Sequence, residues 1–322
     1  MDFTMTDEQV LLRDTARALL SKHCPPSLVR AHMDDPGAAD PLWEHLQDWR
    51  VLGDGPMVDL CLFLEECGAV LAPGPFVATV LARQLSAAAV GDDTASVALA
   101  GRDGLWVPNV DTTKSFVLEA DVVDAVLFVS SSGVEIARPA HVRQIGSVDS
   151  SRRLFEVGVS ARRRVDHRDV EDWLERAYVA LAAELVGTAR WLLQASVEYA
   201  KQRVQFDVPI GSFQAIQHKL ANMSLAVERA VSAVYYGAMA IDADDADRHR
   251  AAHVAKAAAG RAATTAAKDG IQIHGGIGYT WEHDLHLYIR RAYASEHLLG
   301  TSGWHHDRLA DLILPSARDS HR

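Results

Sequence analysis

The pattern of apolar and polar positions changes twice along the 322-residue chain. In residues 1–92, apolar positions recur with helical spacing after Thr6, and Gln9, three residues on, completes the pattern of a capping box. A further apolar helix is expected near 60–70, and a Pro-Gly-Pro break at 73–75 separates it from the next one. The first part of the chain is therefore predicted to be a helical domain.

Residues 93–167 carry short β-prone runs separated by Gly, Asp and Ser. The runs are 96–99, 105–107, 115–118, 125–129, 134–136 and 154–157. This spacing predicts a small antiparallel sheet or barrel. The arginines at 162–164 follow the last run and are expected to be a solvated linker.

Residues 168–322 are helical again, with long alanine-rich periodic stretches. The stretches lie near 170–201, 213–242 and 246–274, and a shorter one follows Glu282. Helices of this length usually pack as an antiparallel bundle. The predicted fold class is α+β, mainly α, with an N-terminal helical domain (1–92), a small middle β-domain (93–167) and a C-terminal four-helix bundle (168–322).

Composition excludes several classes of function. A formal net charge of −11 without a basic patch argues against a nucleic-acid partner. The absence of a long uninterrupted apolar run argues against a membrane span. Three cysteines and fifteen histidines show no metal-ligand spacing, so no metal is expected. An odd number of cysteines does not fit a disulfide framework, and a cytoplasmic location is expected.

Two segments of the last third combine glycine, fixed positive charge and amide side chains at helix ends. In the first segment Arg203 closes one helix, a turn follows at 209–211, and Ser212 is placed to cap the next helix. An arginine beside free backbone amides makes a pocket for phosphate. The alternative is an ordinary cation that offsets the dipole at a helix C-terminus.

The second segment is 269–282. Gly275 and Gly276 have no side chain, so backbone amides there can approach a phosphate or a sugar closely. The alternative is a helix C-cap followed by a loop.

Together the two segments resemble the C-terminal domain of the acyl-CoA dehydrogenases. That family has Arg-x-x-Phe-Gly, then Phe/His-Gln, and further along Gln-Ile-x-Gly-Gly-x-Gly. Here the corresponding stretches begin at Arg203, Phe213 and Gln272. The resemblance extends to 185–189 and, in the N-terminal part, to 62–76. It therefore covers nearly the full length of the chain.

The resemblance implies that the C-terminal segments hold the FAD of a neighbouring subunit across an interface. The implied contacts are Arg203 and Gln205 at the pyrophosphate, Phe213 and Gln214 at the adenine, and Gln272, His274, Gly275 and Gly276 at the adenosine and ribose. Asp207 departs from the family, which usually has glycine there. A carboxylate beside phosphate is expected to weaken binding unless it points away.

The family's reaction needs a carboxylate base that removes the α-proton of an acyl-CoA thioester. The usual Tyr-Glu-Gly-Thr sequence corresponds to Leu298-Leu299-Gly300-Thr301 here, and leucine cannot act as a base. Other members place the glutamate at a position matching Ala177. The remaining candidates are Glu175, otherwise a solvated first-turn residue, and Glu184, otherwise a polar residue at an interface. The catalytic residue is therefore left unassigned.

The β-domain is shorter than in relatives, and the loops that hold the flavin ring in those relatives are not found. The chain resembles the short subunits of actinobacterial α2β2 acyl-CoA dehydrogenases, often involved in steroid breakdown. This implies a longer partner subunit in a heterotetramer, FAD at the interface, an acyl-CoA substrate and an electron acceptor. The alternatives are a self-sufficient homo-oligomeric dehydrogenase with a relocated glutamate base, and a flavin-free structural partner.

Overall fold

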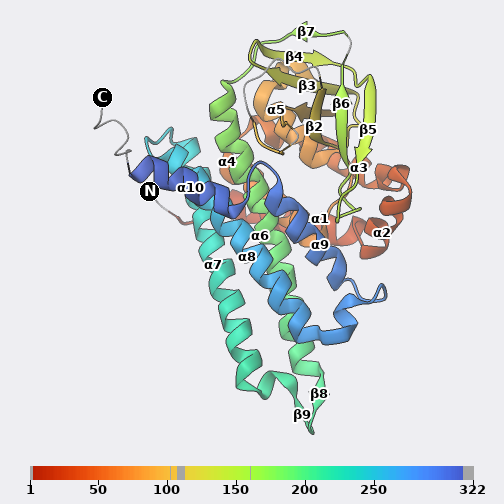
Figure 1. Cartoon of the computed structure of the whole chain (residues 1–322), viewed down its shortest axis with the longest axis vertical. Helices are drawn as coiled ribbons and strands as arrows, with labels where there is room; N and C mark the ends of the chain where they lie inside the picture. Colours follow the sequence, from red (N-terminus) through yellow and green to blue (C-terminus); the bar gives the residue numbers. More distant parts are fainter. Residues whose placement is uncertain (1–2, 102, 107–112, 160, 315–322) are drawn as a thin grey trace.

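The computed structural model describes residues 3–101, 103–106, 113–159 and 161–314. A helical N-terminal part and a β-region lie at one end of the molecule, and a bundle of long helices extends to the other (Figure 1). The N-terminal helices are α1 (Asp7–His23), α2 (Pro26–Asp34), α3 (Asp40–Leu46), α4 (Met57–Val70) and α5 (Phe76–Val90), with 3-10 turns η1 (Pro36–Ala39) and η2 (Gln47–Asp54). The predicted capping box is confirmed, because Thr6 and Gln9 exchange side-chain and backbone hydrogen bonds at the start of α1.

The β-region forms two small sheets. Its strands are β1 (Ala95–Ala98), β2 (Thr113–Leu118), β3 (Ala125–Ser130), β4 (Gly133–Ala137), β5 (His141–Ile145), β6 (Leu154–Gly158) and β7 (Arg163–Arg164). The sheet orders are β1-β3-β4-β7 and β2-β6-β5. The expectation of a wholly antiparallel sheet is wrong, because β1 pairs with β3 in parallel. In the predicted run 105–107, Trp106 makes an isolated bridge with Ala100, and Val107 lies outside the described residues.

The arginines at 162–164 lie in or next to a strand and not in a linker, although Arg163 and Arg164 are exposed to solvent as expected. Arg163 and Arg164 form β7 and pair with β4. The Arg162 guanidinium lies 4.4 Å from the ring centroid of Phe128 and 3.3 Å from the carboxylate of Glu135. This segment therefore closes one edge of the larger sheet.

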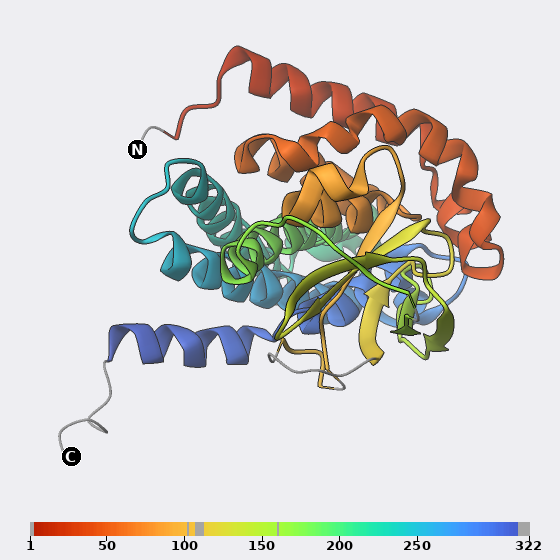
Figure 2. The same ribbon diagram turned by 90° about the horizontal axis from the view of Figure 1, so that it is seen from above.

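The C-terminal part is built on α6, which runs from the β-region to the far end of the molecule (Figure 1). The elements are α6 (Val170–Gln202), β8 (Val204–Gln205), β9 (Val208–Pro209), η3 (Ile210–Ser212), α7 (Gln214–Asp242), α8 (Arg248–His274), η4 (Gly275–Tyr279), α9 (Leu285–His297) and α10 (Ser302–Ile313). Figure 2 shows α10 projecting from the rest of the molecule. Among the described helices, none is long and apolar enough to cross a membrane.

The start of α7 differs from the prediction. Its N-cap is Phe213, which offers no side-chain cap, and the Ser212 hydroxyl instead donates to the carbonyl of Pro209 at 2.7 Å. The prediction that Ser212 caps this helix is therefore wrong. Without that cap, the free amides of the first turn stay available beside the β8–β9 hairpin.

Candidate functional site

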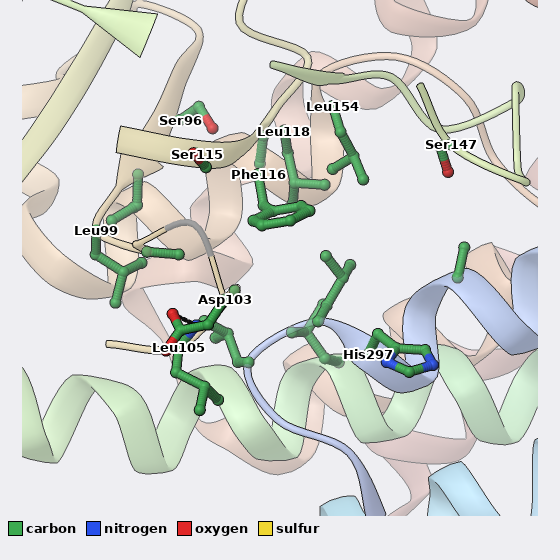
Figure 3. Close-up of a pocket in the computed structure, with 18 of the residues that line it drawn as sticks. Ser96, Leu99, Asp103, Leu105, Ser115, Phe116, Leu118, Ser147, Leu154 and His297 are labelled. Atoms are coloured by element: carbon green, nitrogen blue, oxygen red, sulfur yellow. Dashed lines mark hydrogen bonds between the residues drawn. The ribbon is translucent and has the colours of Figure 1, made fainter. Parts of the chain in front are cut away.

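A cavity of about 550 Å³ lies between the β-region, α5, α6 and the turn that joins α9 to α10. Its walls are mainly apolar, and the large side chains that face it include Leu99, Leu105, Phe116, Leu118, Leu154 and Leu181. Figure 3 shows the labelled leucines and Phe116 converging from opposite sides. Cavities of this size, between about 300 and 1,000 Å³, are typical of small-molecule sites.

The turn that corresponds to the family's Tyr-Glu-Gly-Thr sequence forms part of this wall. Leu298, Leu299 and Thr301 line the cavity, and Leu299 has a φ of +56°, in the left-handed region. The Lys256 ammonium, fully buried, donates to the carbonyls of Glu296 at 2.9 Å and Gly300 at 3.0 Å. Burial lowers the pKa of Lys256 to about 8. The turn is thus held in a shape that places Leu298 and Leu299 against the cavity.

Glu184 does not line the cavity. Its side chain is only 1% exposed and forms ion pairs with Arg152 and, at 3.1 Å, with Arg291. Arg291 also contacts Asp149 at 2.5 Å, and Arg152 donates to the Ser295 hydroxyl at 2.8 Å. These charges join the β-region to α6 and α9. This geometry matches the reading of Glu184 as a polar residue at an internal interface.

Glu175 is buried, so its reading as a solvated first-turn residue is wrong. Its carboxylate lies 3.4 Å from Arg248 and 3.3 Å from His249, both on α8. The hydrogen bond that His249 donates to the Glu175 carboxylate is the main cause that raises the pKa of His249. Glu175 lines a second cavity of about 350 Å³, and Leu105 and Leu299 face both cavities. Glu175 therefore lies on the other side of these leucines from the larger cavity.

The first cofactor segment lies at the far end of the bundle, where Figure 1 places the β8–β9 hairpin. Arg203 is exposed and its guanidinium has no partner among the described residues. Gln205 is exposed in β8, and Gln214 is exposed at the first position of α7. Phe213 is 38% exposed and meets the ring of Phe206 edge to face at 6.3 Å. A free cation and exposed aromatic rings thus surround the start of α7.

The second cofactor segment meets the first. The ring of His274, at the end of α8, stacks on Tyr199 with centroids 4.4 Å apart, and Tyr199 lies one turn before Arg203. The Nδ1 atom of His274 pairs with the carbonyl of Gly270 at 2.9 Å. Its Nε2 atom is buried and has no hydrogen-bond partner in the described part of the chain. Gln272 lies two residues before His274, and its side chain is exposed.

Gly275 and Gly276 border open space. A β-carbon at either position would meet nothing within 4 Å, and Gly275 has a φ of +62°, which favours glycine. With the free guanidinium of Arg203 and the free Nε2 of His274, this end of the bundle fits a group that carries phosphates and an aromatic base, as FAD does. The eight implied contact residues are all absent from the described lining of the 550 Å³ cavity.

Two residues that hold parts of these sites in position were not predicted from the sequence. Tyr199 stacks on the ring of His274. The available signal was its position four residues before Arg203. Lys256 donates to a backbone carbonyl of the 298–301 turn, and a lysine within a run of alanines was the signal there. Lys256 lies outside the two segments that carry the resemblance, whereas Tyr199 lies in the first segment, ahead of Arg203.

Comparison with known proteins places these features in one family. Residues 170–314 match the family described as acyl-CoA dehydrogenase, C-terminal domain. The chain is 36% identical to acyl-CoA dehydrogenase IpdE2 of Mycobacterium tuberculosis, over 92% of this chain and 94% of the relative. It is 35% identical to acyl-CoA dehydrogenase FadE34 of the same organism, over 93% of this chain and 47% of that protein.

Solved structures agree with the sequence relatives. The crystal structure of the ChsE4-ChsE5 complex from Mycobacterium tuberculosis superposes with a TM-score of 0.85 at 25% identity, covering 98% of this chain and 100% of the matched one. Butyryl-CoA dehydrogenase from Megasphaera elsdenii shares the fold with a TM-score of 0.83. The chain therefore belongs to the acyl-CoA dehydrogenase family of FAD-dependent oxidoreductases.

Proposed function

We propose that this chain is the short subunit of a heteromeric acyl-CoA dehydrogenase that introduces an α,β double bond into a steroid-derived CoA thioester. It completes the FAD site of a longer partner subunit in a heterotetramer and has no catalytic base of its own. An electron acceptor then reoxidises the enzyme. The proposed domains are 1–92, 93–167 and 168–322, and the proposed compartment is the cytoplasm.

One observation carries the proposal: the residues that fit FAD and the chain's own cavity lie apart, and the described lining of that cavity has no glutamate. The residues that fit FAD lie at the hairpin end of the bundle, away from the chain's own cavity. That cavity is lined by Leu299, at the position where the resemblance to the family implies the base. Glu184 is neutralised by two arginines, and Glu175 faces the second cavity. These positions count against a self-sufficient enzyme that uses either glutamate.

The chain's own residues have defined tasks in this function. FAD, when bound, accepts the β-hydrogen of the thioester as a hydride. The Arg203 guanidinium offsets the charge of a pyrophosphate, and the glycines at 275–276 let backbone amides come close to it. The exposed rings of Phe206 and Phe213 offer apolar area to the partner or to the adenine. A purely structural partner would have no need for this free cation and this open glycine surface.

The relatives support the heteromeric form. The ChsE4-ChsE5 structure is described as a complex, and one of its chains covers this chain almost completely. Nearly all of this chain matches about half of FadE34. FadE34 therefore contains, in one chain, a part similar to this chain and a second part of similar length. The steroid class of substrate follows from the resemblance to short subunits of steroid-degrading enzymes. A structure that shares the fold is itself described as a steroid ACAD.

The test is the FAD content and native mass of the chain purified alone and co-expressed with a longer acyl-CoA dehydrogenase. Flavin is expected only in the mixed complex. Arg203→Ala should lower flavin retention of the complex about tenfold, because the guanidinium is a charge-assisted donor to phosphate. Arg143→Ala, which removes an exposed arginine of β5, is the matched control and should leave flavin retention unchanged. A yellow oligomer of the chain alone that oxidises acyl-CoA would overturn the proposal.

A further inference from the structure

Two adjacent arginines lie on β7, the edge strand of the larger sheet, at the opposite end of the molecule from the β8–β9 hairpin (Figure 1). A cavity of about 460 Å³ opens there between the C-terminal end of α5, the β3–β4 hairpin and β7. Arg163 and Arg164 both line this cavity and are exposed. Among the described residues, neither guanidinium forms a hydrogen bond or an ion pair. These two positive charges are therefore available to a ligand.

The backbone that carries these arginines is held on both sides. β7 pairs with β4, and the amide of Val165 donates to the carbonyl of Val134 at 3.2 Å. The Ser86 hydroxyl donates to the carbonyl of Asp166 at 2.5 Å, at the point where non-helical backbone angles of Ser86 interrupt α5. The segment is therefore ordered before a ligand arrives, and binding does not have to offset the entropy of ordering it.

His167 extends the set of nitrogen atoms at this cavity. Its Nδ1 atom pairs with the carbonyl of Arg168 at 2.7 Å, so this nitrogen carries a proton. Its Nε2 atom lies beside the β3–β4 hairpin, 3.6 Å from the place that a β-carbon would take at Gly133. In the protonated imidazole, Nε2 is a donor as well. His167 can thus act as a third donor to an anion.

The charge and size of this cavity restrict its ligand. Asp166 is the only carboxylate in the described lining, against two arginines. Two neighbouring guanidinium groups favour an anion with more than one charge, and their forked donors match the oxygens of a phosphate. The volume is larger than a phosphate alone requires and lies in the range of small-molecule sites. The small apolar side chains of Ala88, Ala89, Val134 and Val165 leave room for the rest of such a molecule.

We propose that this cavity binds a small molecule through a phosphate ester or pyrophosphate group, which Arg163 and Arg164 hold by charge-assisted hydrogen bonds. The protonated imidazole of His167 completes the set of donors. The described lining shares no residue with the 550 Å³ cavity or with the residues implied for FAD at 203–214 and 272–276. The site therefore belongs to this chain alone, and the inference does not depend on the proposed function.

The test is calorimetric titration of the full chain with inorganic pyrophosphate at low salt, where screening is weak. The chain carries Arg203→Ala, so that the residues implied for FAD do not contribute a second site. One site per chain is expected. Arg163→Gln and Arg164→Gln should each weaken binding about tenfold, because each removes a charge-assisted donor. Arg138→Gln, which removes an exposed arginine just after the far end of β4, is the matched control and should change nothing.

A further variant tests the cavity itself. Ala88→Glu places a carboxylate at an exposed position of the lining and should abolish pyrophosphate binding by like-charge repulsion. The inference is overturned by the absence of pyrophosphate binding, or by binding that all three cavity variants leave unchanged. Citrate that binds as tightly as pyrophosphate would also overturn it, because the site would then select charge and not phosphate. Each of these outcomes is compatible with flavin in the mixed complex, so this inference and the proposed function can fail separately.

Discussion

Glu184 lies between Arg152 and Arg291, and all three side chains are excluded from water. Asp149 contacts Arg291 from the β-region. Burial would raise the pKa of Asp149, but the attraction of Arg291 and the hydrogen bond from Ser151 outweigh it and hold that pKa below its usual value. At the scale of single residues, these charges are interdependent, so removal of one leaves another buried and unpaired.

Glu184→Gln should therefore destabilise the chain by about 3–5 kcal/mol, because two buried arginines lose their shared carboxylate. Urea unfolding of the heteromer measures this loss. Glu198→Gln, at an exposed ion pair of α6, is the control and should cost less than about 1 kcal/mol. A catalytic role would instead lower kcat of the folded Glu184→Gln enzyme by orders of magnitude at unchanged stability, which would contradict the structural role.

The titration of Lys256 should make the free energy of unfolding depend on pH, and the sign of this dependence follows from its pKa. Its pKa in the folded chain is about 8, below the usual 10.5, because burial disfavours the charged form. Between these values the unfolded chain binds a proton that the folded chain has released, so the free energy of unfolding rises with pH. Relative to Lys256→Met, the wild-type chain should gain up to about 1.4 kcal/mol per pH unit in this window. Parallel stability curves of the two proteins would contradict the lowered pKa.

At the scale of elements, α4 and α6 cross at unusually close range. A β-carbon at Gly187 would lie 1.9 Å from the carbonyl oxygen of Glu65, and one at Gly68 would lie 1.9 Å from that of Glu184. Each glycine therefore faces the backbone of the other helix. The crossing joins the N-terminal helices to the bundle, and each helix has glycine at this point although glycine has a low helix propensity.

Gly187→Ala should lower the free energy of unfolding by about 1–3 kcal/mol, because the added methyl group forces the two helices apart. Helix propensity alone predicts the opposite, a gain of about 1 kcal/mol. Thermal unfolding distinguishes the two signs. Gly276→Ala is the control, since a β-carbon there meets nothing within 4 Å, and its stability should stay within about 0.5 kcal/mol of wild type.

The β8–β9 hairpin turns through Phe206 and Asp207, whose φ values are +53° and +65°. Turns with two left-handed residues favour glycine at the second position. Asp207→Gly should relax this turn and remove a negative charge near the proposed pyrophosphate. The FAD dissociation constant of the heteromer should fall about 3- to 10-fold at low salt and less at high salt.

Asp244→Gly is the matched control, because Asp244 has a φ of +49° in the loop between α7 and α8. It relieves the same kind of strain at a site away from the hairpin. Its FAD affinity should equal that of the wild-type heteromer. An Asp207→Gly heteromer with unchanged or weaker FAD binding would show that the carboxylate points away from the phosphates.

The elements that could be predicted from sequence are those with a local signal. The capping box at Thr6 and the long bundle helices follow from side-chain spacing within one segment. β5 was not predicted, because His141–Ile145 is mainly exposed and shows no apolar run. The parallel pairing of β1 with β3 depends on contacts between distant segments, which spacing does not encode.

At the scale of the whole molecule, the same limit applies to the sites. The motifs around Arg203 and Gly275 could be identified because their residues are contiguous. The environment of Glu175 could not, since the side chains that cover it come from α8, more than 70 residues further along the chain. The larger cavity likewise needs β1, β2, α6 and α9 together. Sites that depend on packing between segments distant in the sequence could therefore not be predicted from the sequence.

An FAD site formed by two subunits gives a prediction for the assembled heteromer. A ligand that binds only the folded complex raises its free energy of unfolding by about 2.7 kcal/mol at a concentration of 100 times Kd. FAD should therefore raise the unfolding temperature of the heteromer but leave that of the chain alone unchanged, because the chain alone supplies one side of the site. Arg203→Ala should reduce the shift of the heteromer. An equal shift of the isolated chain would mean that one subunit encloses FAD by itself, and the homo-oligomeric alternative would then hold.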